Sequence, residues 1–284
     1  MKFAPRMSRF KPSPSQIAST RVRELQAKGE KIIKLTAGEP DFPAPDSAKQ
    51  AMVDLIEQNK IQYTPVNGTL AMRQAVQAKF KRDNNLNYDL DQITVGAGSK
   101  QVLFNALMAT VTSGDEVIIL GPYWTSYPDM VKLAGGTPVL VMAGQNENFK
   151  VRPEALEAAI TTKSKWLIIC SPSNPTGATY TWNELHGLAE VLLRHPQVHV
   201  LTDDVYEYLI FDGHKFSTMA QVEPKLFERT VTCNSVSKTY SMTGFRCGYA
   251  GGPKEVITKM SNMQSQSTAG VSAIGQAAAV GALN

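Results

Sequence analysis

The chain contains 284 residues, of which 43% are hydrophobic and 19% are charged, a composition typical of globular domains. Its net charge of +4 is modest and spread along the chain, which argues against nucleic acid or an anionic membrane surface as a partner. No apolar run approaches the roughly 18 residues of a membrane-spanning helix, and the first residues lack the apolar segment of a signal peptide.

The N-terminal part predicts a proline-containing arm followed by a helix. The apolar residues Ile17, Val22 and Leu25 recur near helical spacing, and Gly29 ends the helix. The elements expected next are a strand at 32–35, a rigid proline-containing loop at 37–43, a helix at 46–58, a turn-rich loop at 63–68 and an amphipathic helix at 70–82.

From residue 93 onward, short apolar strands alternate with helices. The expected strands are 93–95, 116–120, 137–142, 165–170, 198–202, 230–233 and 247–250. The expected helices are 101–111, one after the turn at 121–124, and then 153–160, 182–194, 253–266 and 272–283. This alternation predicts an α/β fold with a mostly parallel seven-stranded sheet flanked by helices. Ligands of such sheets bind at the carboxyl ends of the strands.

The stretch 234–248 has an unusual composition for a loop. Lys238 lies among small hydroxyl residues, and Arg246 follows between two glycines. Small neighbours leave room for a flat ring, and hydroxyls with an arginine can bind an anionic group on it. The pattern suits a lysine that holds an aldehyde cofactor as a Schiff base, but taken alone a surface lysine in a Ser/Thr-rich loop is the commoner explanation.

Other polar residues follow the expected strands. Gly98, Ser99 and Lys100 lie between a strand and a helix N-terminus, where backbone N–H groups can bind phosphate, although such a turn can also be only a turn. Trp124 follows a buried strand and could either cap the core or stack on a heteroaromatic ring. Asn174 is held between two prolines, in a pose suited to precise hydrogen bonding or in a rigid turn.

A carboxylate ends the strand at 198–202. Asp203 is costly there unless it pairs with a cation, for which a protonated pyridine nitrogen is one candidate, and Tyr206 could reach the same ring. The alternative is an N-cap for the next segment.

The cysteines and histidines show no metal-ligand spacing, so we expect no metal. The three cysteines, Cys170, Cys233 and Cys247, cannot all pair within one chain, and we expect reduced, buried thiols in a cytoplasmic protein.

Seven motifs in order along nearly the whole chain make it resemble the pyridoxal-phosphate enzymes of fold type I, specifically the class-I/II aminotransferases. The motifs are A-G-E-P-D-F at 37–42, Y-T-P-V-N-G at 63–68, G-A-G-S-K-Q at 96–101, P-Y-W-T-S-Y-P at 122–128, S-N-P-T-G at 173–177, D-D-V-Y at 203–206 and S-V-S-K-T-Y-S-M-T-G-F-R-C-G at 235–248. The residues of these motifs are most similar to those of bacterial aspartate aminotransferases.

The resemblance implies a role for each matching residue. Lys238 would form a Schiff base with pyridoxal phosphate and later move a proton at the substrate. Asp203 would keep the ring nitrogen protonated, Asn174 and Tyr206 would hydrogen-bond the ring 3-oxygen, and Trp124 would stack on the ring. The residues implied to bind the phosphate are Gly98, Ser99, Lys100, Ser235, Ser237 and Arg246.

The resemblance also implies a homodimer, in which Tyr63 reaches the phosphate of the neighbouring subunit. Gly38, with Trp124 and Asn174, would contact the substrate. Residues 1–45 would form an N-terminal arm and a segment of a small domain, and residues 46–284 the cofactor-binding large domain. Family members are longer, and the part that would supply most of the small domain and an arginine for the substrate carboxylate is absent. We therefore expect this chain alone to transaminate poorly.

Transfer of an amino group between aspartate and 2-oxoglutarate is the leading interpretation. Aromatic, kynurenine, methionine or prephenate-type substrates remain alternatives on the same fold, as do a lyase or synthase and an inactive cofactor-binding fragment. The effector domain of a transcription regulator is a further alternative, but residues 1–34 are too short and too interrupted by proline for a helix-turn-helix.

Overall fold

The computed structural model describes residues 1–35 and 38–284. Its strands are β1 (Ile93–Gly96), β2 (Glu116–Gly121), β3 (Thr137–Met142), β4 (Ser164–Ile169), β5 (His199–Asp203), β6 (Thr230–Ser235) and β7 (Gly248–Gly251). Its α-helices are α1 (Pro14–Ala27), α2 (Asp46–Glu57), α3 (Leu70–Asn84), α4 (Ser99–Thr110), α5 (Ser126–Ala134), α6 (Pro153–Ala159), α7 (Trp182–Arg194), α8 (Met219–Val222), α9 (Val236–Thr239), α10 (Lys254–Ser265) and α11 (Ala273–Leu283). Short 3₁₀ helices span Pro5–Ser8, Leu90–Gln92, Gln145–Glu147, Pro224–Arg229 and Thr243–Phe245.

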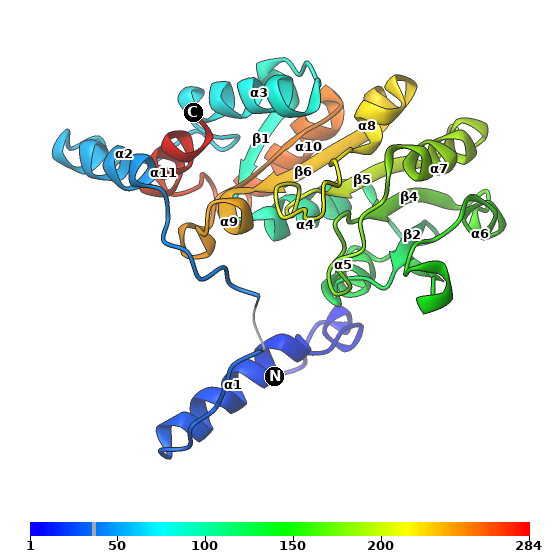
Figure 1. The fold of residues 1–284 in the computed structure, drawn as a ribbon, viewed down its shortest axis with the longest axis horizontal. Coiled ribbons are helices and arrows are strands. Elements are labelled where there is room, and N and C mark those ends of the chain that lie inside the picture. Colours follow the sequence, from blue (N-terminus) through cyan, green and yellow to red (C-terminus); the bar gives the residue numbers. More distant parts are fainter. Residues whose placement is uncertain (36–37) are drawn as a thin grey trace.

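The strands form one seven-stranded sheet in the order β1-β7-β6-β5-β4-β2-β3 (Figure 1). Five neighbouring strands, β3, β2, β4, β5 and β6, are mutually parallel, while β7 runs antiparallel to both β6 and β1. The prediction of a mostly parallel seven-stranded sheet is confirmed. The parallel strands direct their carboxyl ends to one edge of the sheet, where a ligand site is expected.

Alternate residues of each central strand point to opposite faces of the sheet. In β4, Trp166 and Ile168 pack with α4, α5 and α10, whereas Leu167 and Ile169 pack with α6, α7 and α8. Both faces are therefore buried, which is why the strands read as continuous apolar runs rather than as an alternating pattern.

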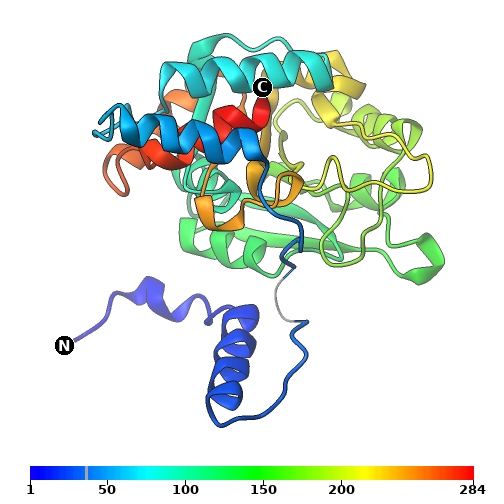
Figure 2. The ribbon, with the colours of Figure 1, turned by 60° about the vertical axis from the view of Figure 1, so that its left-hand side comes forward.

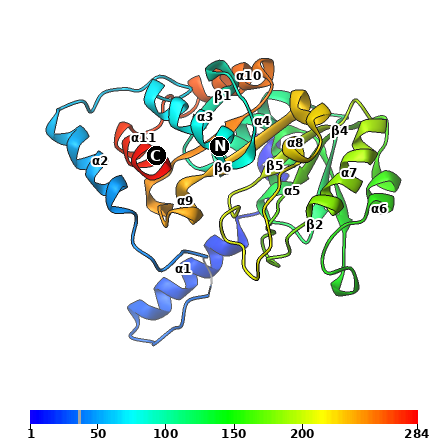
Figure 3. The same ribbon diagram turned by 45° about the horizontal axis from the view of Figure 1, so that its top comes forward.

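A third apolar cluster closes the β1–β7 edge. Helices α3 and α11 cover it, and α2 lies beside α11 in Figure 3. The contact is close because a side chain at Gly281 would come within 2.5 Å of the Ser47 carbonyl oxygen. The backbones of α2 and α11 can therefore approach each other only because position 281 carries no side chain.

The N-terminal arm projects from this body, with its first part beside α5. Helix α1 is formed as predicted, but it buries no residue, and Figures 1 and 2 show it set away from the helices around the sheet. The predicted strand at 32–35 is wrong: these residues have no regular structure, and Ile33 and Leu35 are exposed. An apolar run cannot form a strand without a neighbouring strand to bond. Ala37, the first residue of one motif, lies outside the described residues.

No helix among the described residues has both the length and the apolar character needed to cross a membrane.

Candidate active site

Lys238 lies in α9, the single helical turn that follows β6. Its Nζ donates a hydrogen bond to the backbone carbonyl of Gly38, so the structure brings these two predicted residues together. Burial lowers the pKa of Lys238, Glu39 opposes this shift, and Arg246 adds to it. A larger share of the amine is therefore neutral, and able to act as a base, than for a solvated lysine.

Ser235 begins this helical turn. Its Oγ accepts a hydrogen bond from the backbone N–H of Ser237 at 2.9 Å, and both serines are buried. The cap fixes the turn that carries Lys238 directly at the carboxyl end of β6.

Asp203 is the last residue of β5, and its side chain is buried. Its Oδ2 accepts a hydrogen bond from the Tyr127 hydroxyl at 2.6 Å, whereas its Oδ1 has no hydrogen bond of standard geometry to any described residue. Burial raises the pKa of Asp203 to about 6, against the lowering effects of Tyr127 and of the Val205 backbone N–H. A buried carboxylate oxygen without a partner is costly and suits a site that a cation completes.

Tyr206 lies near enough to Asp203 to feel its charge, and Asn174 contacts Tyr206. The Asn174 Nδ2 donates to the Tyr206 hydroxyl at 3.4 Å. Burial raises the pKa of Tyr206 to about 12, so its phenol is neutral at physiological pH and can still donate a hydrogen bond.

The N-terminus of α4 forms a cradle with Arg246. Gly98 precedes the helix with a φ of +87°, and a side chain there would lie 2.4 Å from the Arg246 guanidinium. The guanidinium donates to the carbonyls of Ala97 and Thr243 at 3.1 and 3.0 Å. Gly98 has no side chain that could cap α4, so the first backbone N–H groups of the helix, beginning at Ser99, are open to an anion.

Lys100 adds a second cation beside this cradle. Its Nζ lies 4.6 Å from the centroid of the Trp124 ring, and burial lowers its pKa, as does Arg246. The structure thus places Lys100 over Trp124, a contact that the sequence does not suggest.

One predicted residue stays apart, and one contributing residue is missed by the sequence. Tyr63 is fully exposed in the loop before α3. Tyr127, the partner of Asp203, belongs to a motif in which only Trp124 has a predicted role. Its only signal in the sequence is its position about one helical turn after Trp124.

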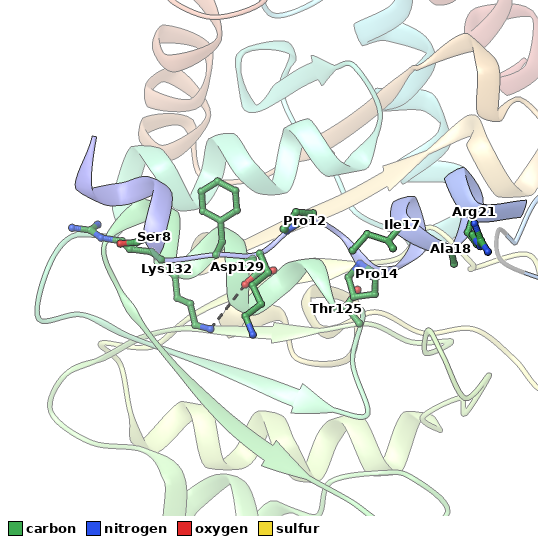
Figure 4. Close-up of a pocket in the computed structure, with 12 residues that line it drawn as sticks. Ser8, Pro12, Pro14, Ile17, Ala18, Arg21, Thr125, Asp129 and Lys132 are labelled. Atoms are coloured by element: carbon green, nitrogen blue, oxygen red, sulfur yellow. Dashed lines mark ion pairs between the residues drawn. The ribbon is translucent and has the colours of Figure 1, made fainter. Parts of the chain in front are cut away.

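One cavity between described residues lies away from these side chains. A space of about 900 Å³ separates the N-terminal arm from α5 and is lined by Ile17, Thr125, Asp129 and Lys132, among others (Figure 4). The Asp129 and Lys132 side chains are 4.0 Å apart on its wall. The described residues that line it include none of the predicted site residues.

A lysine, a buried acid and an anion cradle at the strand ends of a doubly covered sheet suit an enzyme that holds a phosphorylated aldehyde. Comparison with known proteins agrees: the chain belongs to the family "Aminotransferase class I and II", whose model matches residues 30–284. The protein is therefore an aminotransferase-like enzyme of that family.

Several proteins to which the chain is similar are named aminotransferases. An aspartate/prephenate aminotransferase from Cereibacter sphaeroides is 54% identical over 278 residues, which are 98% of this chain and 70% of that protein. The crystal structure of the aspartate aminotransferase from Rhizobium meliloti superposes with a TM-score of 0.96 at 48% identity, covering 100% of this chain and 71% of its own. The aspartate aminotransferase from Thermus thermophilus with maleate gives 0.95 at 40% identity, covering 100% and 73%.

Enzymes of this family depend on pyridoxal phosphate, and the residues present fit that cofactor. The unpartnered Oδ1 of Asp203 suits a protonated ring nitrogen, and the uncapped start of α4 beside Arg246 suits a phosphate. Among residues 1–35 and 38–284, no group of three His, Cys, Asp or Glu side chains could hold a metal ion.

Proposed function

We propose that this protein transfers the amino group between L-aspartate and 2-oxoglutarate by a ping-pong reaction with pyridoxal phosphate. The observation that carries the proposal is the buried Asp203 carboxylate with one unpartnered oxygen, at the end of β5 and next to β6, the parallel strand that leads to a lysine of lowered pKa. Aspartate as the donor is supported by the names of the relatives, which are aspartate or aspartate/prephenate aminotransferases.

When bound, pyridoxal phosphate supplies an aldehyde that condenses with amines and a ring that withdraws electrons. We assign Asp203 to the ring nitrogen, Asn174 and Tyr206 to the ring 3-oxygen, Trp124 to the face of the ring, and Lys238 to the aldehyde carbon. The residues assigned to the phosphate are Gly98, Ser99, Lys100, Ser235, Ser237 and Arg246.

Lys238 has the second task of moving a proton. Its lowered pKa provides a neutral amine that can take the proton from the substrate Cα and return it later. Asp203, as an anion, keeps the proton on the ring nitrogen, and Tyr206, as a neutral phenol, donates a hydrogen bond.

A homodimer with shared sites is part of the proposal. Tyr63 is fully exposed, and Val53, Ile56 and Ile61 near it in sequence are also exposed, which supports a second subunit covering this region. Tyr63 would then reach the phosphate of the partner, while Gly38, Trp124 and Asn174 would contact the substrate in their own chain.

We further propose that residues 1–45 form an N-terminal arm and a segment of a small domain, and residues 46–284 the cofactor-binding large domain, which is supported by the absence of buried residues in α1. A cytoplasmic location is supported by the three buried, unpaired cysteines.

Prephenate is a second candidate amino-group acceptor. It is favoured by the 54% identity with an aspartate/prephenate aminotransferase. The two candidates differ in the amino acceptor and not in the cofactor residues, so a comparison of substrates must separate them.

The test is a half-reaction assay with the purified chain loaded with pyridoxal phosphate, followed over a single turnover so that slow conversion is also detected. We expect aspartate to convert the cofactor to its amine form faster than other amino acids, and Lys238→Ala to stop this conversion while cofactor can still bind. The regenerating half-reaction with 2-oxoglutarate or prephenate then ranks the acceptors by kcat/KM. A Lys238→Ala protein that converts the cofactor at the wild-type rate would contradict the proposal.

A further inference from the structure

We propose that Tyr127 is a positioning residue for Asp203: its phenol holds one carboxylate oxygen, which leaves the other oxygen fixed toward the ring nitrogen of the cofactor. The inference rests on the proposed function, because it assumes that Asp203 pairs with that nitrogen.

The phenol itself is held rigidly. Tyr127 is 2% exposed and lies in the first turn of α5. Its backbone N–H donates to the Trp124 carbonyl at 3.0 Å, and the two rings meet edge to face at 5.4 Å. The same turn therefore fixes the ring proposed to face the cofactor and the hydroxyl that contacts Asp203.

The direction of the hydrogen bond is fixed by the proton affinities of the two groups. Burial, the Asp203 charge and Cys170 raise the pKa of Tyr127 well above its ordinary value, so the phenol is the donor. The 2.6 Å distance is that of a hydrogen bond to a charged acceptor. A carboxylate held at one oxygen cannot rotate freely, so its second oxygen keeps one direction.

Cys170, which follows β4, and Cys233 in β6 face Asp203, and burial raises the pKa of both thiols; Tyr206 has a pKa of about 12. Burial also raises the pKa of the next residue, Asp204, to about 8, but the side chains that act on Asp204 are those of Thr218, Glu207, Thr202 and Lys79. The hydrogen bond from Tyr127 acts on Asp203, whose pKa is about 6, and lowers it. Removing the hydroxyl therefore raises the pKa of Asp203 further.

Two consequences follow for the cofactor. Binding needs the ionised carboxylate, so the acid limb of the pH profile of cofactor affinity shifts to higher pH in Tyr127→Phe. Without the hydrogen bond from the Tyr127 hydroxyl, the Asp203 carboxylate is also a stronger base. It therefore takes a larger share of the proton that it would share with the ring nitrogen. Loss of a hydrogen bond to a charged group weakens binding by about tenfold or more.

The experiment compares Tyr127→Phe with Tyr180→Phe, a matched control. Tyr180 is also a buried phenol, but its oxygen accepts from the Val151 backbone N–H on the other face of the sheet. The readouts are the dissociation constant of pyridoxal phosphate from about pH 5 to 9 and the ¹⁵N chemical shift of the ring nitrogen in bound, labelled cofactor. Neither depends on turnover.

We expect Tyr127→Phe to weaken cofactor binding by about tenfold, to move the acid limb to higher pH, and to shift the ¹⁵N signal toward that of unprotonated pyridine. Tyr180→Phe should change none of these. If Tyr127→Phe matches the wild type in affinity and ¹⁵N shift, the inference is overturned.

A second substitution covers the case in which Tyr127→Phe does not fold. Incorporation of 3-fluorotyrosine at position 127 keeps the ring and makes the phenol a stronger donor, so the acid limb should move to lower pH. The inference would be overturned if the acid limb of the pH profile stayed where it is in the wild type or moved to higher pH.

Asp203→Asn separates this inference from the proposed function. If Asp203→Asn leaves the ¹⁵N signal unchanged, the pairing of Asp203 with the ring nitrogen fails, and the inference fails with it. If Asp203→Asn alters the signal and Tyr127→Phe does not, only the inference fails. The double variant should bind the cofactor little more weakly than Asp203→Asn, because the two residues act as one unit.

Discussion

At the residue scale, burial acts on two ionisable side chains in opposite directions. It lowers the pKa of Lys238 and raises that of Asp203, so each charged form is disfavoured in the protein without cofactor. Burial removes the water that would stabilise each charge. The cofactor we assign to these residues would replace that water with a covalent partner for the amine and a cation for the carboxylate. The site is therefore less stable without its ligand than with it.

The first prediction concerns Asp203 and pH. Its folded-state pKa of about 6 lies above the ordinary value of 3.8, so its contribution to stability is present below about pH 3.8 and is lost as the pH rises through 6. Above that pH the buried charge costs about 3 kcal/mol. We expect Asp203→Asn to stabilise the cofactor-free protein against urea at about pH 8 and to have little effect at about pH 4. Equal effects at both pH values would contradict this.

Single residues are only partly predictable from the sequence. Asp203 and Lys238 can be identified because a charge at the end of an apolar strand and a lysine among hydroxyl residues are conspicuous. Tyr127 cannot, because an aromatic residue in an amphipathic helix is usually part of a core, and the partner of its hydroxyl lies 76 residues away in the sequence.

At the scale of elements, the N-terminus of α4 and the start of β7 depend on a glycine. A side chain at Gly248 would lie 2.3 Å from the backbone of Gly98 and Ser99. These are backbone atoms, so they cannot move aside as the end of a flexible side chain could. Gly244 lies in the 3₁₀ helix just before β7, and a side chain there would meet no described atom within 4 Å. It therefore serves as the matched control for a substitution at position 248.

The second prediction is that Gly248→Ala separates β7 from the start of α4 and opens the anion cradle. Forcing a side chain into this contact costs about 1–3 kcal/mol, and affinity for pyridoxal phosphate should fall with it. Gly244→Ala should leave both stability and affinity near their wild-type values. Chemical denaturation and cofactor titration measure the two effects, and equal behaviour of the two variants would refute the role given to this contact.

A buried ion pair ties α3 to the loop after β5. Lys79 and Glu207 are both buried and bonded to each other, and Asn84 accepts from the Lys79 Nζ at 2.7 Å. Burial raises the pKa of Glu207 even though Lys79 opposes the shift. The pair thus stabilises the fold only while both partners are present.

The third prediction follows from this pair. Lys79→Met leaves Glu207 buried and unpaired and should cost about 3–5 kcal/mol, whereas Lys79→Met combined with Glu207→Leu should recover most of that loss. Lys49→Met, which breaks the exposed pair with Asp46, should change little. Urea denaturation of the wild type and these three variants tests this, and a double variant less stable than Lys79→Met would contradict it.

The regular elements are more predictable than their pairing. A continuous apolar run such as 165–170 predicts a strand buried on both faces, and the structure has it. The reversal of β7 is not predictable, since a strand of four residues carries no mark of direction. The strand expected at 32–35 is wrong because no neighbouring strand lies beside these described residues to bond them.

At the scale of the whole molecule, two parts of the described surface are notably exposed. The arm with α1 buries no residue of that helix, and the loop with Tyr63 is exposed. The chain spans about 70% of the length of the relatives it matches. An arrangement of subunits cannot be derived from the sequence, because it depends on surfaces that meet only in an assembly.

The fourth prediction concerns the dimer. Sedimentation should show a wild-type species of twice the mass of one chain, and Tyr63→Phe should weaken cofactor binding by a few-fold in the dimer, because a hydrogen bond to phosphate is lost. The thermal stability of the cofactor-free protein should not change, since Tyr63 is fully exposed in the single chain. The shared site would be contradicted if the protein were a monomer and if the wild type and Tyr63→Phe bound the cofactor with the same affinity.

The covalent role of Lys238 is tested most directly by borohydride reduction of the protein loaded with pyridoxal phosphate, followed by peptide mass spectrometry. We expect one modified peptide, with the cofactor attached to Lys238. Attachment to another lysine of the site, such as Lys100, or no attachment at all, would contradict that role.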